Sequence, residues 1–218
     1  MPLTVKICGL STPDTLSAAL DAGADMVGFV FFPASPRHIN LTQARDLGAM
    51  AKGRALKVAL TVDADDSDLG NIVEALRPDL LQLHGHESVA RVREVKQLFG
   101  LPVAKVLPIA EAADLRPLPG YAAVADRILF DAKPPKDATR PGGLGKPFDW
   151  NLLADVALDR PWMLSGGLHA GNVAEALRIT RAPGVDVSSG VESAPGVKDI
   201  AMIEAFIRAA RAGKKVMS

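Results

Sequence analysis

Cys8 is the only cysteine of the 218-residue chain, and it ends a short apolar run directly before Gly9. A lone cysteine is most often a small core residue. If the run is a β-strand, however, Lys6 and Cys8 share one face, because side chains alternate along a strand. An ammonium group nearby can favour the thiolate, so Cys8 is a candidate nucleophile or general base.

A second titratable group, Asp131, closes the apolar run 128–130. A carboxylate at the end of a strand can cap a helix or accept a hydrogen bond from a loop. Where it faces a thiol across a bound substrate, it can instead take part in acid–base catalysis. We therefore predict that Cys8 and Asp131 lie on opposite walls of one site. We expect His84 to form a hydrogen bond at the rim of that site.

Glycine and serine cluster in two segments near the C-terminus, 165–167 and 188–190, and a third glycine-rich segment covers 142–146. Glycines often only make turns. After the last strands of a sheet, however, they let the backbone approach an anion, and the amide groups that begin a following helix carry partial positive charge. The segments predict a phosphate site whose residues are Gly145, Gly166, Gly167, Ser188, Ser189 and Gly190.

Arg37 lies between Pro36 and His38, and it is either a solvated surface charge or a clamp for a substrate carboxylate. The four histidines and the single cysteine show no His-x₃-His or Cys-x₂-Cys spacing, so we predict no metal site. The segment 142–146 also differs from a nucleoside-triphosphate loop, because no strand directly precedes it and a proline follows it.

Eight short runs rich in apolar and β-branched residues could position these groups. Helical patterns separate the runs, with the spacing expected for a strand, a helix and two short loops. Near-continuous apolar runs indicate parallel strands that are buried on both faces. The predicted strands are 3–8, 26–32, 56–62, 80–84, 103–109, 127–131, 162–165 and 185–188.

Alternating strands and helices form either an open doubly wound sheet or a closed (β/α)₈ barrel. Eight units that run to both ends of the chain favour the barrel, which has no sheet edge. We predict a single-domain (β/α)₈ TIM barrel over residues 1–218. The active site of such a barrel lies at the carboxyl ends of the strands, where the candidate groups would converge. The longest connection, 133–148, is expected to be an active-site loop.

The composition argues against several classes of protein. Lys and Arg together number 25, as do Asp and Glu, so there is no basic excess for nucleic-acid binding. A single cysteine cannot form an internal disulfide. The chain shows no signal-peptide pattern and no apolar run approaching about 18 residues, so we expect no membrane insertion. A cytoplasmic location is the expectation.

Taken together and in order, the strand ends resemble those of the phosphoribosylanthranilate isomerases of tryptophan biosynthesis. Each motif alone is weak, but the ordered set spans nearly the whole chain. The matching segments are Lys6-Ile7-Cys8-Gly9, Gly28-Phe29-Val30-Phe31 with Ser35-Pro36-Arg37, Gln82-Leu83-His84-Gly85, Asp131 with Lys133, Gly142-Gly143-Leu144-Gly145 with Phe148-Asp149-Trp150, Ser165-Gly166-Gly167-Leu168 and Asp186-Val187-Ser188-Ser189-Gly190-Val191-Glu192.

The resemblance implies an Amadori rearrangement of N-(5-phospho-β-D-ribosyl)anthranilate to 1-(2-carboxyphenylamino)-1-deoxy-D-ribulose 5-phosphate. The general acid of the family falls on Asp131, its general base on Cys8 and its anthranilate-facing arginine on Arg37. The protonated Schiff base formed on the way is itself an electron sink, so the resemblance implies neither a cofactor nor a metal. The expected partner is this small-molecule substrate, with no nucleic acid and no membrane, bound by a monomer or a homodimer.

The residues leave two other functions open. One is another sugar-phosphate barrel isomerase, such as the histidine-pathway enzyme that acts on a bis-phosphate aminoaldose. That enzyme ends its first strand with aspartate, whereas this chain has Cys8. The other is a non-catalytic barrel that only binds a phosphorylated ligand, and the presence of both Cys8 and Asp131 argues against it.

Overall fold

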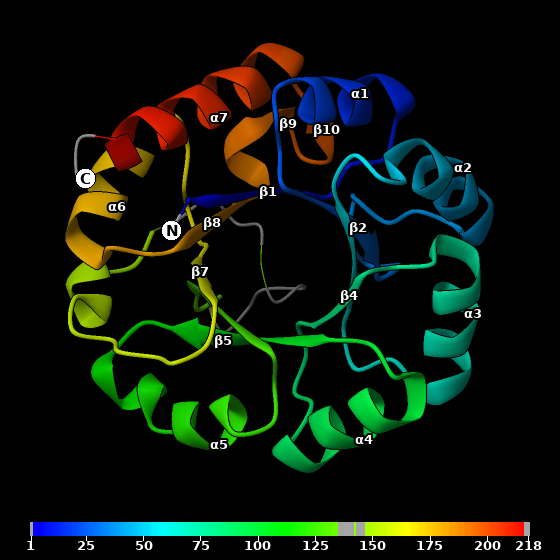
Figure 1. Cartoon of the computed structure of the whole chain (residues 1–218), viewed down its shortest axis with the longest axis horizontal. Coiled ribbons are helices and arrows are strands. Elements are labelled where there is room, and N and C mark those ends of the chain that lie inside the picture. Colours follow the sequence, from blue (N-terminus) through cyan, green and yellow to red (C-terminus); the bar gives the residue numbers. More distant parts are fainter. Residues whose placement is uncertain (1, 135–141, 143–146, 216–218) are drawn as a thin grey trace.

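A closed ring of eight parallel strands forms the centre of the molecule (Figure 1). The computed structural model describes residues 2–134, 142 and 147–215. The strands follow chain order around the ring, and β1 pairs with both β2 and β8, which closes it. The strands are β1 (Thr4–Cys8), β2 (Met26–Phe31), β3 (Leu56–Thr61), β4 (Leu80–Leu83), β5 (Val103–Ile109), β6 (Arg127–Ala132), β7 (Trp162–Leu164) and β8 (Gly184–Val187).

Helices surround the ring on its outer side (Figure 1). Thr12, Asn40 and Ser88 each cap one of them by accepting a hydrogen bond from the backbone N–H three residues later. The helices are α1 (Pro13–Asp21), α2 (Leu41–Ala51), α3 (Asp66–Leu76), α4 (Val89–Phe99), α5 (Leu118–Ala122), α6 (Val173–Thr180) and α7 (Ile200–Lys215), with 3₁₀ turns η1 (Ala112–Leu115), η2 (Trp150–Leu153) and η3 (Ser189–Val191).

The predicted barrel is confirmed, and every predicted strand matches an observed strand to within one residue at each end. The alternative of an open sheet is wrong, because the backbone pairing of β1 with β8 joins Thr4 to Gly184 and Ile7 to Val187. The strands can be located from sequence because a strand buried on both faces is a near-continuous apolar run bounded by polar residues and glycine.

Two features depart from the regular alternation of strands and helices. Between β6 and β7 the described residues form only the turn η2, where the repeating unit predicts a helix. Asp149 caps this turn, and only residues 154–160 lie between it and Pro161, which directly precedes β7 and has no N–H to donate. After β8 the chain adds a hairpin of β9 (Glu192–Ala194) and β10 (Val197–Lys198), which is too short to be recognised as an alternating pattern.

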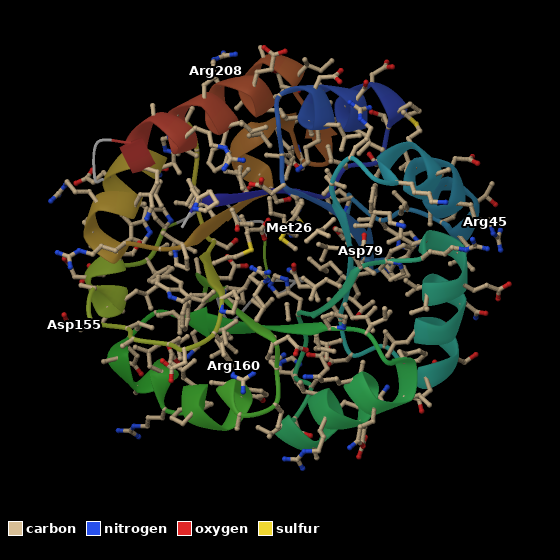
Figure 2. All side chains as sticks on the ribbon, in the orientation of Figure 1. Met26, Arg45, Asp79, Asp155, Arg160 and Arg208 are labelled. Carbon is tan, nitrogen blue, oxygen red and sulfur yellow. The ribbon has the colours of Figure 1, made fainter. Side chains whose placement is uncertain are left out.

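Hydrophobic side chains fill both sides of the strand ring. Figure 2 shows Met26 within the ring, whereas Arg45 and Arg208 lie on the outer circumference. No described helix is both long and apolar enough to cross a membrane. Apolar side chains fill the interior of the ring at the amino-terminal part of the strands. Among the described residues, the space inside the ring that remains open therefore lies toward the carboxyl ends of the strands. The inner apolar cluster is Met26, Val58, Leu80, Ala104, Val106, Leu129 and Met163.

Candidate active site

A cavity of about 380 Å³ opens at the carboxyl ends of the strands. Residues from β1, β4 and β6 line it, together with the loops that follow β2, β7 and β8. Eight of the site residues predicted from the sequence line this cavity: Cys8, Arg37, Asp131, Gly166, Gly167, Ser188, Ser189 and Gly190. The ninth, Gly145, lies outside the described residues.

Cys8 is the last residue of β1, and Gly28 of β2 lies directly opposite it in the ladder. A Cβ atom added at Gly28 would lie 2.9 Å from Cys8 Sγ and 3.1 Å from Lys6 Nζ. Both functional atoms therefore lie in the space that a side chain at residue 28 would take. The prediction that Lys6 and Cys8 share one face of β1 is confirmed.

Lys6 forms a buried ion pair with Asp186 of β8, with Nζ 2.9 Å from Oδ1. The two side chains are only 1% and 6% exposed. Their α-carbons are direct neighbours in the ladder that closes the barrel. The strand register thus pairs the ammonium beside Cys8 with a carboxylate from the other end of the chain.

The pKa of the Cys8 thiol is raised, and burial is the main cause. Lys6 acts in the opposite direction, but Asp186 raises the Cys8 pKa again because a second negative charge opposes ionisation. Burial also lowers the pKa of Lys6, yet Asp186 and Cys8 outweigh it, so the pKa of Lys6 is raised overall. Lys6 thus favours the thiolate, as its place beside Cys8 indicated, but burial and the charge of Asp186 outweigh it.

Asp131 lies at the end of β6, and one oxygen of its carboxylate, Oδ2, is 3.2 Å from Nε2 of His84. The other oxygen, Oδ1, accepts a hydrogen bond of 2.9 Å from the N–H of Ala132. The prediction places His84 at the rim, where the structure finds it in contact with Asp131. Sequence alone could not identify this pair, because 47 positions separate the two residues.

Glycine backbone packs closely around the Asp131 carboxylate. Gly166 has a φ of +88°, and a Cβ there would lie 2.5 Å from the Ala132 nitrogen and 3.0 Å from Asp131 Oδ1. A Cβ at Gly142 would lie 2.7 Å from Asp131 Oδ2 and 2.9 Å from His84 Cε1. The glycines allow the loops to cover the carboxylate, which keeps it buried.

The loops after β7 and β8 meet at Gly190, where any Cβ would collide with the carbonyl oxygen of Leu168. Asn172, which begins α6, donates a 2.9 Å hydrogen bond to the carbonyl of Gly167 and so holds the β7 loop. The turn η3 begins at Ser189, and the first N–H groups of such a turn have no acceptor within it. Adjacent glycine-rich backbone with available amides suits the binding of an anion such as phosphate.

Arg37 is buried in the wall of the cavity rather than solvated at the surface, so that alternative is wrong. Its side chain crosses Gly9, where a Cβ would lie 2.6 Å from Arg37 Cδ. Its guanidinium is paired with Glu192, with Nε and Nη2 each 2.7 Å from a carboxylate oxygen. In the sequence Glu192 is only the last residue of the segment 186–192, and only the fold shows that it contacts Arg37.

Residues 5–209 match the family model described as N-(5'phosphoribosyl)anthranilate (PRA) isomerase. A relative from Bradyrhizobium sp. (strain BTAi1 / ATCC BAA-1182), an N-(5'-phosphoribosyl)anthranilate isomerase, is 73% identical over 216 residues, which cover 99% of each chain. The solved structure of phosphoribosyl anthranilate isomerase from Thermotoga maritima is 33% identical. It superposes with a TM-score of 0.87 over 96% of this chain and 99% of that one.

Two further solved structures are similar to this chain. One is a phosphoribosyl anthranilate isomerase in complex with reduced 1-(o-carboxyphenylamino)-1-deoxyribulose 5-phosphate, at 30% identity and a TM-score of 0.83 over 96% of this chain and 99% of that one. The other is described as monomers generated from the dimeric isomerase of Thermotoga maritima. It is 31% identical, with a TM-score of 0.83 over the same shares of the two chains.

Proposed function

This chain belongs to the N-(5'-phosphoribosyl)anthranilate isomerase family, and we propose that its reaction uses Asp131 as general acid and Cys8 as general base. It is an isomerase of tryptophan biosynthesis. The observation that carries the proposed roles is that both side chains line one cavity of about 380 Å³ together with two glycine-rich loops. A cavity of this size accommodates a small ligand such as an aryl sugar phosphate.

The proposed substrate has a phosphate at one end and an aromatic carboxylate at the other, joined by a ribose. The relative with reduced 1-(o-carboxyphenylamino)-1-deoxyribulose 5-phosphate holds a ligand that likewise has a carboxyphenylamino group and a phosphate, joined by a deoxyribulose unit instead of a ribose. We assign the phosphate to the amides of the loops at Gly166, Gly167 and 188–190, and the carboxylate to Arg37. Gly145 belongs to the same proposal as a third loop contact. The ribose then lies between Cys8 and Asp131.

Ring opening is the first chemical step. The Asp131 carboxyl transfers its proton to the ribose ring oxygen as the bond from that oxygen to C1 breaks. The anthranilate nitrogen supplies the electron pair that forms the C1–N double bond, so a protonated Schiff base and a C4 hydroxyl result. Asp131 is left as a carboxylate beside His84, 3.2 Å away, which can donate a hydrogen bond to it.

Proton removal from C2 is the second step. The Cys8 thiolate takes the proton, and the electrons of the C–H bond form a C1–C2 double bond while the iminium nitrogen becomes neutral. The enolamine then tautomerises to the ketone. Burial raises the pKa of Cys8, but the positive charge of the Schiff base next to Sγ acts in the opposite direction. Formation of the iminium thus favours the Cys8 thiolate at the step in which the C2 proton is removed.

Single substitutions test these assignments. We expect Cys8→Ala and Asp131→Ala each to reduce turnover at least about 100-fold, the usual scale for losing a general acid or base. Loss of fluorescence from freshly generated phosphoribosylanthranilate, followed in chelator without added cofactor, measures the rate. Asp66→Asn, at an exposed carboxylate paired with Arg91, is the matched control and should retain full activity. Near-normal turnover of either alanine variant would refute that residue's role, and a requirement for metal would refute the cofactor-free reaction.

The proposal also covers location and assembly. The composition favours the cytoplasm, and the chain acts as a monomer or a homodimer. The Thermotoga maritima relative is described as dimeric, which makes a dimer a specific possibility to measure. Light scattering of the purified protein across a concentration series distinguishes the two states.

A further inference from the structure

Glu192 is the centre of a buried cluster of charges behind the wall of the cavity. Its Oε1 accepts hydrogen bonds of 2.7 Å from Arg37 Nε and from Lys198 Nζ. Its Oε2 accepts one of 2.7 Å from Arg37 Nη2 and one of 3.1 Å from the N–H of Gly196. The carboxylate is therefore held by four donors and is fixed in both position and plane.

Lys198 connects the same carboxylate to the predicted phosphate loop. Its Nζ donates to the carbonyl of Ser188 at 2.9 Å and lies 3.2 Å from Ser188 Oγ, in addition to its contact with Glu192. Three acceptors match the three N–H groups of an ammonium. The side chains of Lys198 and Glu192 are 1% and 3% exposed.

Together the three side chains carry two positive charges and one negative charge. A pair of Arg37 and Glu192 alone would be neutral, and it would offer a substrate carboxylate little electrostatic attraction. Burial lowers the pKa of Lys198, and the charge and hydrogen bond of Glu192 act in the opposite direction. When Lys198 is protonated, it offsets the charge of Glu192, and the cluster carries a net charge of about +1. That charge suits a ligand with anionic groups at both ends.

The hairpin of β9 and β10 brings this cluster to the loop that follows β2. Gly196, in the turn between the two strands, has a φ of +84°, and a Cβ there would lie 2.6 Å from the carbonyl oxygen of Pro36. The hairpin thus packs directly on the residue that precedes Arg37. Arg37 and Ser188 line the cavity, whereas Glu192 and Lys198 do not, so these two can act only through their neighbours.

We propose that Glu192 is a positioning residue, which orients the Arg37 guanidinium toward the substrate carboxylate and, through Lys198, fixes Ser188 at the phosphate end. The inference rests on the proposed function, in which Arg37 contacts the carboxylate. An arginine that is already held in place loses less side-chain entropy when the substrate binds. Glu192 therefore strengthens binding of the substrate without touching it.

The first test is the variant Glu192→Gln, which keeps the shape of the side chain and removes its charge. We expect KM for phosphoribosylanthranilate to rise at least about tenfold while kcat changes less than about threefold, because orientation of a binding group is lost rather than an acid or base. Glu204→Gln is the matched control, since Glu204 forms an exposed ion pair with Arg208 in α7, and its KM should not change.

A second variant keeps the inference testable if Glu192→Gln does not fold. Glu192→Asp retains the buried charge but is one methylene shorter. It should fold, and its KM should rise at least about threefold but less than that of Glu192→Gln. Circular dichroism and thermal melting establish that each variant is folded before its kinetics are measured. An unchanged KM in a folded Glu192→Gln or Glu192→Asp variant overturns the inference.

A substrate analogue separates positioning from general destabilisation. The corresponding aniline glycoside lacks the carboxylate, so the ratio of its KM in Glu192→Gln to that in wild type should be much smaller than the ratio for the natural substrate. Adding Glu192→Gln to an Arg37→Met background should likewise raise KM little beyond its value in Arg37→Met alone. Equal KM ratios for the two substrates, or KM increases that are fully additive in the double variant, contradict action through Arg37.

Failure of this inference can be distinguished from failure of the proposed function. If Cys8→Ala and Asp131→Ala retain activity, the catalytic assignment is wrong whatever Glu192 does. If those variants are inactive while Glu192→Gln binds substrate like wild type, the catalytic assignment stands and only the positioning role is wrong.

Discussion

Lys6 and Asp186 face each other across the junction at which β1 closes the barrel on β8, with Nζ 2.9 Å from Oδ1. The pair lies beside Cys8, and the two charges act on the thiol in opposite directions. A buried ion pair is costly to form but more costly to break, because removal of one partner leaves an uncompensated charge. The geometry near Cys8 therefore depends on both residues together.

Replacing Lys6 with methionine should destabilise the protein by about 3–5 kcal/mol, since Asp186 would remain buried without its partner. It should also move the pH dependence of Cys8 alkylation to higher pH, because Lys6 lowers the pKa of that thiol. Denaturant unfolding and the rate of reaction with iodoacetamide measure the two effects. The double variant Lys6→Met/Asp186→Leu should recover most of the stability. If the single variant is as stable as wild type, the ion pair does not hold the closure of the barrel.

Gly28→Ala should reduce activity at least about tenfold, because the new methyl group would lie 2.9 Å from Cys8 Sγ and 3.1 Å from Lys6 Nζ. A steady-state assay compares kcat/KM with that of wild type. Gly70→Ala is the matched control, because it lies in α3 and its Cβ would approach only the ring of Phe99, at 4.0 Å. The control should be at least as stable as wild type, since alanine favours a helix over glycine. Full activity in Gly28→Ala would show that Cys8 does not need this space.

His84→Ala should lower kcat by roughly tenfold, less than the loss expected for Asp131→Ala, because a polar contact with the proposed acid is removed but the acid remains. Steady-state kinetics over a range of pH measure the change. His86→Ala is the control, because the His86 side chain is 96% exposed and contacts Asp63 instead. Equal kcat values in His84→Ala and wild type would mean that the 3.2 Å contact has no role in turnover.

Acid should weaken the native state partly through Glu192. Burial raises the pKa of its carboxyl, but the hydrogen bond from Arg37 and the charge of Lys198 outweigh burial, and the pKa is lowered from its ordinary value of 4.5. A group with a lowered pKa in the folded state stabilises it above the unfolded value, and this stabilisation is lost as pH falls through the folded value.

Wild type should therefore lose more stability than Glu192→Gln as pH is lowered from about 6 to below 4, even if the variant is less stable at neutral pH. Thermal melting in a series of buffers measures both curves, with Glu204→Gln as the control that should follow wild type. Parallel curves for wild type and Glu192→Gln would mean that the pKa of Glu192 is not lowered by folding.

Sequence patterns predicted the barrel and the residues that gather at its mouth, but not how those residues pair. Cys8, Asp131 and the loops at 165–167 and 188–190 end or follow apolar strands, and the rule that strand ends carry the active site places them together. The catalytic roles of Cys8 and Asp131 remain predictions. The turn η2 and the β9–β10 hairpin were not predictable, because elements of two to four residues carry no periodic signal.

The sequence by itself determined the order of the strands and their burial on both faces, because a near-continuous apolar run is a local property of the chain. Only the tertiary structure decided that Lys6 meets Asp186, that His84 meets Asp131 and that Arg37 meets Glu192. These contacts join residues 47 to 180 positions apart. They depend on strand register and on the close packing of loops across Gly9, Gly166 and Gly196, and neither is encoded in any short segment.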